Sequence, residues 1–252
     1  MMKFKNLNQK DQKHHSLNLM FTELDFFNAV SRIGLRADNV SRCPDQWVGR
    51  VLYSPHGFCY LGNAFNDFTW RRNLSEIPSD IKNIFNLLII LESPHVDEYK
   101  MDSDGGFSAI GPANGQTGRN LRAYLDTATV EITRQINFKN PKEFNLFLMN
   151  AVPYQCSLGE KLKGQNSKNR DAIFLNCWKY AKEDFIERLT RYTNEKTIVI
   201  NACTKGTRKR GHDLNLSRQV DEAVTSLNVF KNNYFKRCHP SSAPHWKSGR
   251  SW

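Results

Sequence analysis

Three absences limit what this chain of 252 residues can be. No apolar run approaches the ~20 residues that a membrane-spanning helix needs, so we expect no membrane partner. The polar segment 3–15 lacks the apolar centre of a secretion signal, which favours a cytoplasmic protein. The six cysteines include no Cys-x-x-Cys pair of the kind that zinc and iron–sulfur sites use. We therefore expect no metal, no other cofactor, and reduced thiols rather than disulfides.

What the chain has in excess is positive charge. Its 36 lysines and arginines outnumber its 25 acidic residues, for a net charge of +11. Such an excess favours a polyanionic partner, with nucleic acid as the main candidate, and a basic protein without such a partner is the alternative. The length suits one domain over residues 16–252, with its core at 87–245, and we expect a monomer. Residues 1–15 are predicted to be a mobile basic tail.

The alternation of apolar runs and helical patterns predicts an α/β fold. Apolar runs predict buried strands at 87–91, 144–148, 197–200 and 229–235. Apolar residues at helical spacing predict helices at 118–136, 170–193 and 215–227. Strands that alternate with helices pair in parallel, so we expect a three-layer α/β/α sandwich around a mainly parallel four-stranded sheet. A helix over 17–30 and a hairpin over 47–62 are expected as N-terminal additions, and the polar run 160–170 as a mobile surface loop.

Each predicted strand leads into polar residues. The side chains that follow the four strands in turn are Glu92, Asn150, Asn201 and His239. In an open α/β sheet, ligands bind where the strands end at their carboxyl edge. The sequence therefore predicts that these four side chains lie toward one edge of the sheet and form a single site.

Short motifs accompany these strand ends. In chain order they are Glu92-Ser93-Pro94-His95, Gly115-Gln116-Thr117-Gly118 with its continuation to Leu121, Asn150, and His239-Pro240-Ser241. In this order, over residues 87–245, they resemble the uracil-DNA glycosylase superfamily. The resemblance implies an enzyme that flips a nucleobase out of DNA and hydrolyses its bond to the sugar. It implies that Glu92 lies in the water-activating loop, that Asn150 reads the base and that His239 stabilises the leaving base.

The chemistry of the reaction suits the same residue types. Breaking an N-glycosidic bond develops positive charge on the sugar and negative charge on the base. A carboxylate at Glu92 can orient water and stabilise the sugar cation, and a histidine at His239 can donate to the anionic base. An amide at Asn150 can pair with the edge of a flipped base. The alternatives are structural: an ion-paired or capping acid, a loop-stabilising histidine and a turn asparagine.

Further contacts to DNA are expected around these residues. Base contacts are expected from Ser93, Pro94, His95 and Phe107, the last as a stacking platform or else a core phenylalanine. Backbone contacts are expected from Gly115, Gln116, Thr117, Gly118, Ser241, Ser242, Lys205 and Arg208. The glycine segment opens a helix whose free N–H groups can hold a phosphate, and Lys205 begins the densest basic cluster, which extends to Arg210. Turn-forming residues and a solvated basic loop are the alternatives.

The chain also departs from the family pattern. Ser93 stands where the best-known branch has aspartate, and His95 where it has a tyrosine that excludes methylated pyrimidines. The cysteines of the iron–sulfur branch are absent. The loop over 96–114 is long and acidic, which suits a bulkier base than uracil. Trp246 follows the His-Pro-Ser loop and is either a wedge in the DNA stack or a packed core residue.

These observations lead to one preferred function and two alternatives. The preferred function is a DNA glycosylase that leaves an abasic site. Its substrate is uracil or a modified, for example glucosylated, phage cytosine, in DNA repair or in antiphage defence. The first alternative is a catalytically silent DNA-binding module on the same fold. The second is a nucleotide-binding protein of flavodoxin-like architecture, which the lack of a strong nucleotide fingerprint disfavours.

Overall fold

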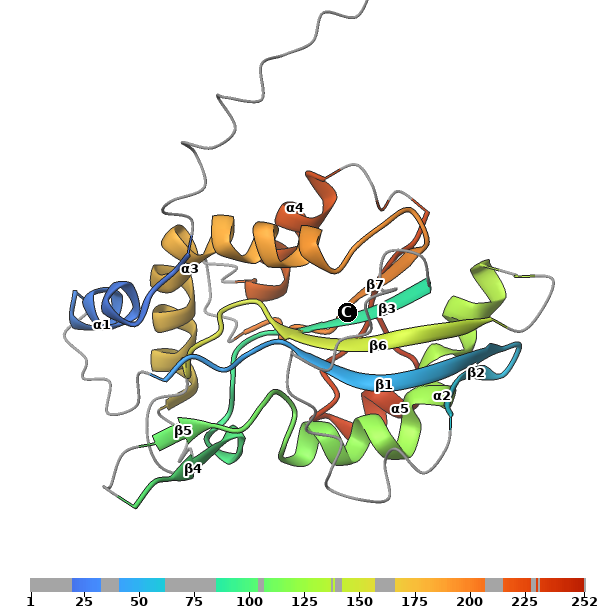
Figure 1. Ribbon diagram of the computed structural model, residues 1–252, viewed down its shortest axis with the longest axis horizontal. Helices are drawn as coiled ribbons and strands as arrows, with labels where there is room; N and C mark the ends of the chain where they lie inside the picture. Colours follow the sequence, from blue (N-terminus) through green and yellow to red (C-terminus); the bar gives the residue numbers. More distant parts are fainter. Residues whose placement is uncertain are drawn as a thin grey trace, which may run out of the picture.

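The computed structural model describes residues 20–32, 41–61, 85–103, 107–136, 138, 142–156, 166–206, 215–227, 230 and 232–251. The predicted basic tail, residues 1–15, lies outside these ranges. The described residues build a mixed α/β fold on a six-stranded, mostly parallel sheet with the strand order β2-β1-β6-β3-β7-β8 (Figure 1). No helix among the described residues is long and apolar enough to cross a membrane.

The centre of the sheet is parallel. Strand β3 (Phe85–Leu91) lies between β6 (Glu143–Asn150) and β7 (Thr197–Asn201), and β7 pairs in turn with the short strand β8 (Tyr234–Lys236). These four strands run parallel to one another, as the alternation of strands and helices predicted. The prediction of a continuous strand over 229–235 is wrong, because residues 230, 232 and 233 lie in turns and, among the described residues of this segment, only those of β8 pair with β7.

The predicted hairpin belongs to the sheet, so the expected four strands are six. Strand β1 (Gln46–Ser54) pairs antiparallel with both β2 (Gly57–Tyr60) and the free edge of β6. The turn between β1 and β2 needs glycine, because Gly57 has φ +111° and a Cβ there would lie 1.9 Å from the carbonyl oxygen of Asp126. The hairpin is buried on much of its surface and protects an edge that would otherwise expose unpaired backbone groups.

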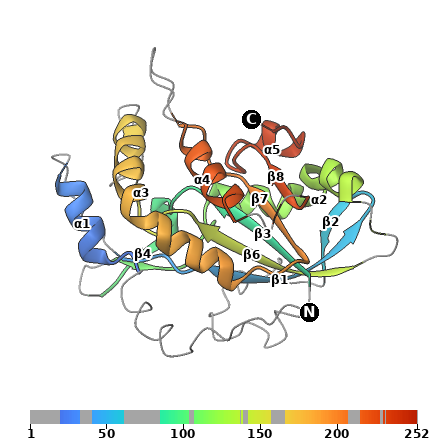
Figure 2. The ribbon, with the colours of Figure 1, turned by 90° about the horizontal axis from the view of Figure 1, so that it is seen from above.

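Helices cover both faces of the sheet (Figures 1 and 2). On one face lie α2 (Gln116–Ile136) and α5 (Ala243–Lys247); on the other lie α1 (Glu23–Ser31), α3 (Asn166–Arg191) and α4 (Leu216–Thr225). Alternate residues of β3 contribute to the two cores, with Leu87, Ile89 and Leu91 on the α2 side and Leu88 and Ile90 on the α3 side. A strand buried on both faces needs an unbroken aliphatic run, which is what the sequence contains.

Three predicted segments differ from the structure. Helix α1 begins at Glu23, where the N-cap residue Thr22 forms a capping box with Asp25, rather than at residue 17. Residues 166–170, predicted as part of a mobile loop, form the first turn of α3. The predicted loop over 96–114 contains the 3-10 turn η4 (Val96–Glu98) and a hairpin of β4 (Tyr99–Met101) with β5 (Phe107–Ala109). Local hydrogen bonding, rather than apolar periodicity, defines these short elements.

The connections define where the sheet opens toward solvent. The chain leaves β3 through α2 on one face and leaves β7 through α4 on the other face. Because β3 and β7 are neighbours, their connections diverge at the carboxyl ends of these two strands. Ligands of open α/β sheets bind at such a divergence.

Candidate active site

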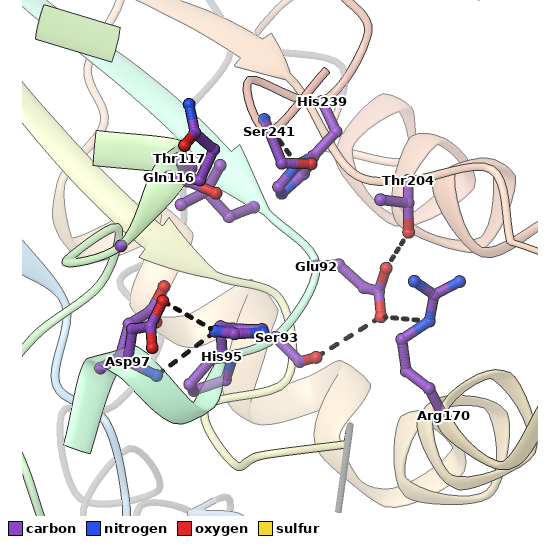
Figure 3. A pocket seen from close by; sticks show the side chains of 14 residues that line it. Glu92, Ser93, His95, Asp97, Gln116, Thr117, Arg170, Thr204, His239 and Ser241 are labelled. Carbon is purple, nitrogen blue, oxygen red and sulfur yellow. Dashed lines mark hydrogen bonds and ion pairs between the residues drawn. The ribbon is translucent and has the colours of Figure 1, made fainter. Parts of the chain in front are cut away.

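A pocket of about 290 Å³ lies at this divergence. Its volume is near the lower end of ligand sites, which span roughly 300–1,000 Å³. Residues from five parts of the chain line it: Leu91 at the end of β3 with Glu92, Ser93, Pro94, His95, Asp97 and Glu98 after it; Gly115, Gln116 and Thr117 at the start of α2; Arg170 of α3; Thr204 after β7; and His239 and Ser241. The structure therefore brings the predicted catalytic pair, Glu92 and His239, to one cavity (Figure 3).

Glu92 is a buried acid of the pocket. It follows β3 directly and its side chain points toward Arg170 and Thr204 in Figure 3. The hydroxyl of Thr204 donates to Oε2, the hydroxyl of Ser93 donates to Oε1 at 3.4 Å, and Nε of Arg170 lies 3.4 Å from Oε1. Burial raises the pKa of Glu92 to about 7, although Arg170 acts to lower it. The carboxyl group thus changes its charge near neutral pH.

Arg170 is a pocket residue that the sequence did not reveal. It lies near the start of α3, where its guanidinium contacts Glu92 and pairs with the buried Asp171 at 2.6 Å. The only sequence signal is the Arg-Asp pair at the start of an amphipathic pattern, and such pairs are common. The prediction placed residue 170 at the end of a mobile surface loop, so Arg170 was not considered as a site residue.

His239 is held as a neutral ring with a defined tautomer. The backbone N–H of Ser241 donates to Nδ1 at 3.2 Å, and the Ser241 hydroxyl lies 2.8 Å from the same nitrogen. An Nδ1 that accepts an N–H carries no proton, so the proton of the neutral ring is on Nε2. Burial lowers the pKa of His239 to about 4, and the positive charge of Arg170 and the neighbouring His95 act in the same direction. His239 can therefore donate from Nε2 without being charged.

A side chain of helix α2 holds the loop that carries His239. The side-chain amide of the buried Asn120 donates to the carbonyl oxygen of Pro240 at 2.6 Å. A few residues further on, Trp246 is fully buried in the core between the sheet and α2. Of its two predicted roles, Trp246 thus has the packed one and is not available as a wedge in DNA.

The predicted phosphate site at the start of α2 already has an acid beside it. A Cβ on Gly115 would lie 2.5 Å from Oδ2 of Asp97, so a larger residue there would displace the Asp97 side chain. Asp97 also contacts His95, whose Nδ1 lies 3.4 Å from Oδ2. A carboxylate near a helix N-terminus is stabilising and competes with a phosphate for the same N–H groups. Gln116 and Thr117 line the pocket, whereas the buried Gly118 does not.

Asn150 is close to the pocket but does not line it. It is 1% exposed, and its amide nitrogen lies 3.6 Å from Sγ of Cys43. The amide is next to Glu98, a pocket-lining acid that is 3% exposed. Burial raises the pKa of Glu98 to about 8. In the sequence Glu98 was only one of several acids in a long loop.

The remaining predicted residues separate into three groups. Asn201 is fully buried, and its amide donates at 3.0 Å to both the Ser217 carbonyl and the Tyr234 hydroxyl, so it is structural. Lys205 is exposed and follows Thr204, and Ser242 is the N-cap residue of α5. Phe107 begins β5 but its side chain is not among the described parts, and the basic residues from Arg208 to Arg210 lie outside the described residues.

No family model, curated protein or solved structure matches the chain. The resemblance to the uracil-DNA glycosylase superfamily therefore stays a prediction. Within the described residues, no group of three or more His, Cys, Asp and Glu side chains is arranged to hold a metal ion.

Proposed function

We propose that this protein is a DNA glycosylase that flips a base into the pocket at the ends of β3 and β7 and hydrolyses its N-glycosidic bond. The observation that carries the proposal is the meeting of Glu92 and His239 in one pocket, from strand ends far apart in the sequence. Their protonation states suit the two halves of the reaction, because one is an acid that ionises near neutrality and the other a neutral donor.

The reaction divides between the two residues as follows. The ionised Glu92 orients a water molecule and stabilises the positive charge that develops on the sugar. The water oxygen bonds to the sugar C1′ as the C1′–N bond breaks, and the bonding electrons leave with the base. Nε2–H of His239 donates a hydrogen bond to the anionic base. The water proton passes to Glu92 or to solvent, and an abasic site remains.

The proposed partner is DNA and the proposed substrate is uracil or a modified cytosine of phage DNA. The pocket suits one flipped base, and Pro94, Ser93 and His95 form part of its wall. The net charge of +11 supports binding to the DNA backbone. We propose that the protein acts as a cytoplasmic monomer, in repair of deaminated bases or in defence against phages.

The test is an excision assay with defined DNA. The protein is incubated with oligonucleotides that carry uracil and with phage DNA that carries glucosylated hydroxymethylcytosine, and alkali then converts abasic sites to strand breaks. We expect breaks with at least one of these substrates and free base in the supernatant. Binding to DNA without release of any base would replace the proposal by the catalytically silent DNA-binding module.

A further inference from the structure

We propose that Glu98, supported by Asn150, reads the base in this pocket, and that the base is a pyrimidine whose Watson–Crick edge offers an N–H donor beside an acceptor. This inference rests on the proposed function. It assigns base recognition to the loop over 96–114, with Asn150 as a positioning residue that acts through Glu98.

The first support is an unfilled hydrogen-bonding capacity next to the pocket. Oε2 of Glu98 and Oδ1 of Asn150 are both buried, and neither has a hydrogen-bond partner among the described residues. Buried polar atoms almost always have partners, so two unsatisfied oxygens on interacting side chains indicate a candidate ligand site. Glu98 is one of the residues that line the pocket, so a ligand placed there lies next to this residue.

The second support is the placement of Glu98 within the fold. It ends the turn η4, where its backbone N–H donates to the His95 carbonyl at 2.9 Å, and its carbonyl accepts from the Ile110 N–H at 2.7 Å. The turn and the hairpin that follows it are thus tied together by Glu98 itself. Because these two backbone hydrogen bonds already fix the position of Glu98, little conformational entropy is lost when a ligand binds to it.

The groups around Glu98 favour its protonated form at neutral pH. Burial is the main cause, and the carboxylate of Asp97 adds to it, against the Asn150 amide and the backbone groups of Ala113 and His95. The other titratable neighbours, Cys43 and Tyr99, add no charge, because burial raises the pKa of both above their ordinary values. A protonated carboxyl group offers one donor and one acceptor, whereas a carboxylate only accepts.

This pairing pattern selects the class of ligand. A donor beside an acceptor complements N3 and the N4 amino group of cytosine, or N3–H and O4 of uracil. It leaves C5 of the ring uncontacted by Glu98, so a substituent at C5 is compatible with the same recognition. Methylation at N3 would remove either pairing. The pocket is thus expected to accept C5-modified pyrimidines and to reject N3-methylated ones.

The pH dependence of kcat/KM distinguishes the role of Glu98 in base recognition from the role of Glu92 in catalysis. In the wild-type protein kcat/KM should rise as Glu92 ionises near pH 7 and fall as Glu98 ionises near pH 8. Glu98→Gln keeps a donor and an acceptor at every pH, so the fall at alkaline pH should disappear. Glu98→Leu should reduce excision by at least about tenfold, because it leaves the base edge unpaired. Glu195→Gln, at the exposed opposite end of β7, is the matched control and should change neither limb.

A second measurement does not depend on turnover. Binding of free cytosine, free uracil and their N3-methyl derivatives is followed by nuclear magnetic resonance at neutral and alkaline pH. This measurement uses the wild-type protein and Glu98→Gln, so it does not require Glu98→Leu to fold. If the protein excises a base and kcat/KM of Glu98→Gln still falls at alkaline pH, the role of Glu98 is overturned and the glycosylase proposal stands. Glu98-dependent binding of free pyrimidines without any excision would overturn the glycosylase proposal and retain the recognition of the base. Equal binding of methylated and unmethylated bases would overturn the recognition proposal.

Discussion

The Nε atom of Arg170 lies 3.4 Å from the Oε1 atom of Glu92, at the boundary between helix α3 and the end of strand β3. The same cation lowers the pKa of Glu92 and the pKa of His239. One side chain from a third element thus favours a charged acid and a neutral histidine at the same time. These are the two protonation states that the proposed reaction uses.

Replacing Arg170 should therefore move the pH profile rather than only reduce the rate. In Arg170→Met the pKa of Glu92 should rise, so the rising limb of kcat/KM moves to higher pH and activity at neutral pH falls severalfold. Part of the loss should be recovered as pH is raised. Arg191→Met, an exposed arginine at the end of the same helix, is the control. A uniform loss at every pH would mean that Arg170 only supports the fold.

Removing either proposed catalytic group should abolish most excision and leave DNA binding intact. Glu92→Gln and His239→Ala are each expected to reduce single-turnover excision by roughly a hundredfold or more. Affinity for the same oligonucleotide, measured by fluorescence anisotropy, should stay within a few fold. Glu143→Gln, exposed at the opposite end of β6, controls for loss of a surface acid. Undiminished excision by a variant would remove that residue from the mechanism.

Stability should depend on pH through Glu98. Its pKa in the folded protein is raised from 4.5 to about 8, so between these values the folded state holds a proton that the unfolded state has lost. The free energy of unfolding therefore falls as pH rises through this window. Glu98→Gln cannot ionise and should lack this part of the fall. Urea unfolding of both proteins from about pH 5 to about pH 9 measures the difference, and parallel curves would contradict the raised pKa.

DNA affinity should fall steeply with salt if the basic surface contacts phosphates. Lys205→Gln alone should reduce the slope of log K against log salt by about one unit. Neutralising Arg208, Lys209 and Arg210 as well should flatten the slope further and weaken all sequences alike. Affinity measured over a salt series tests this. A slope near zero in the wild-type protein would show that the positive charge has another purpose.

His95 should influence which ring substituents fit. It lines the pocket from an exposed position beside Asp97, where tyrosine adds bulk. If the substrate is a bulky modified cytosine, His95→Tyr should reduce its excision more than that of uracil. The ratio of the two rates in wild-type and variant protein is the measurement. Equal loss for both bases would remove His95 from substrate selection.

The sequence predicted the parts of the fold that follow from long apolar patterns. Strand β3 was recognisable because it is buried on both faces, and the parallel order followed from its alternation with helices. The joining of the hairpin to β6 was not predictable, because an antiparallel pairing between distant segments leaves no periodic signal in either one. The strand predicted over 229–235 is shorter than expected, since the polar residues at 231–233 interrupt the apolar pattern and β8 begins only after them.

The candidate site was predictable to a similar extent. Glu92 and His239 were found because each follows an apolar run. Arg170 and Glu98 were not found, because their importance arises from burial and from neighbours that come from other elements. In the sequence alone, an acid in a polar loop and an arginine at the start of a helix are not distinguished from many similar residues. Their altered pKa values exist only once the pocket is assembled.

The packing of Trp246 beneath α2 has a consequence for how the protein loses function. The His239 loop lies between a strand of only three residues and a five-residue helix whose buried anchor is this indole, and the Asn120 side chain of α2 adds one further contact to it. A segment held by such short elements can detach while the central sheet remains folded. We therefore expect Trp246→Ala, or removal of the chain after Ser242, to inactivate the protein at temperatures where its overall secondary structure is unchanged. Heat inactivation would then precede unfolding, and activity would be the more sensitive measure of integrity.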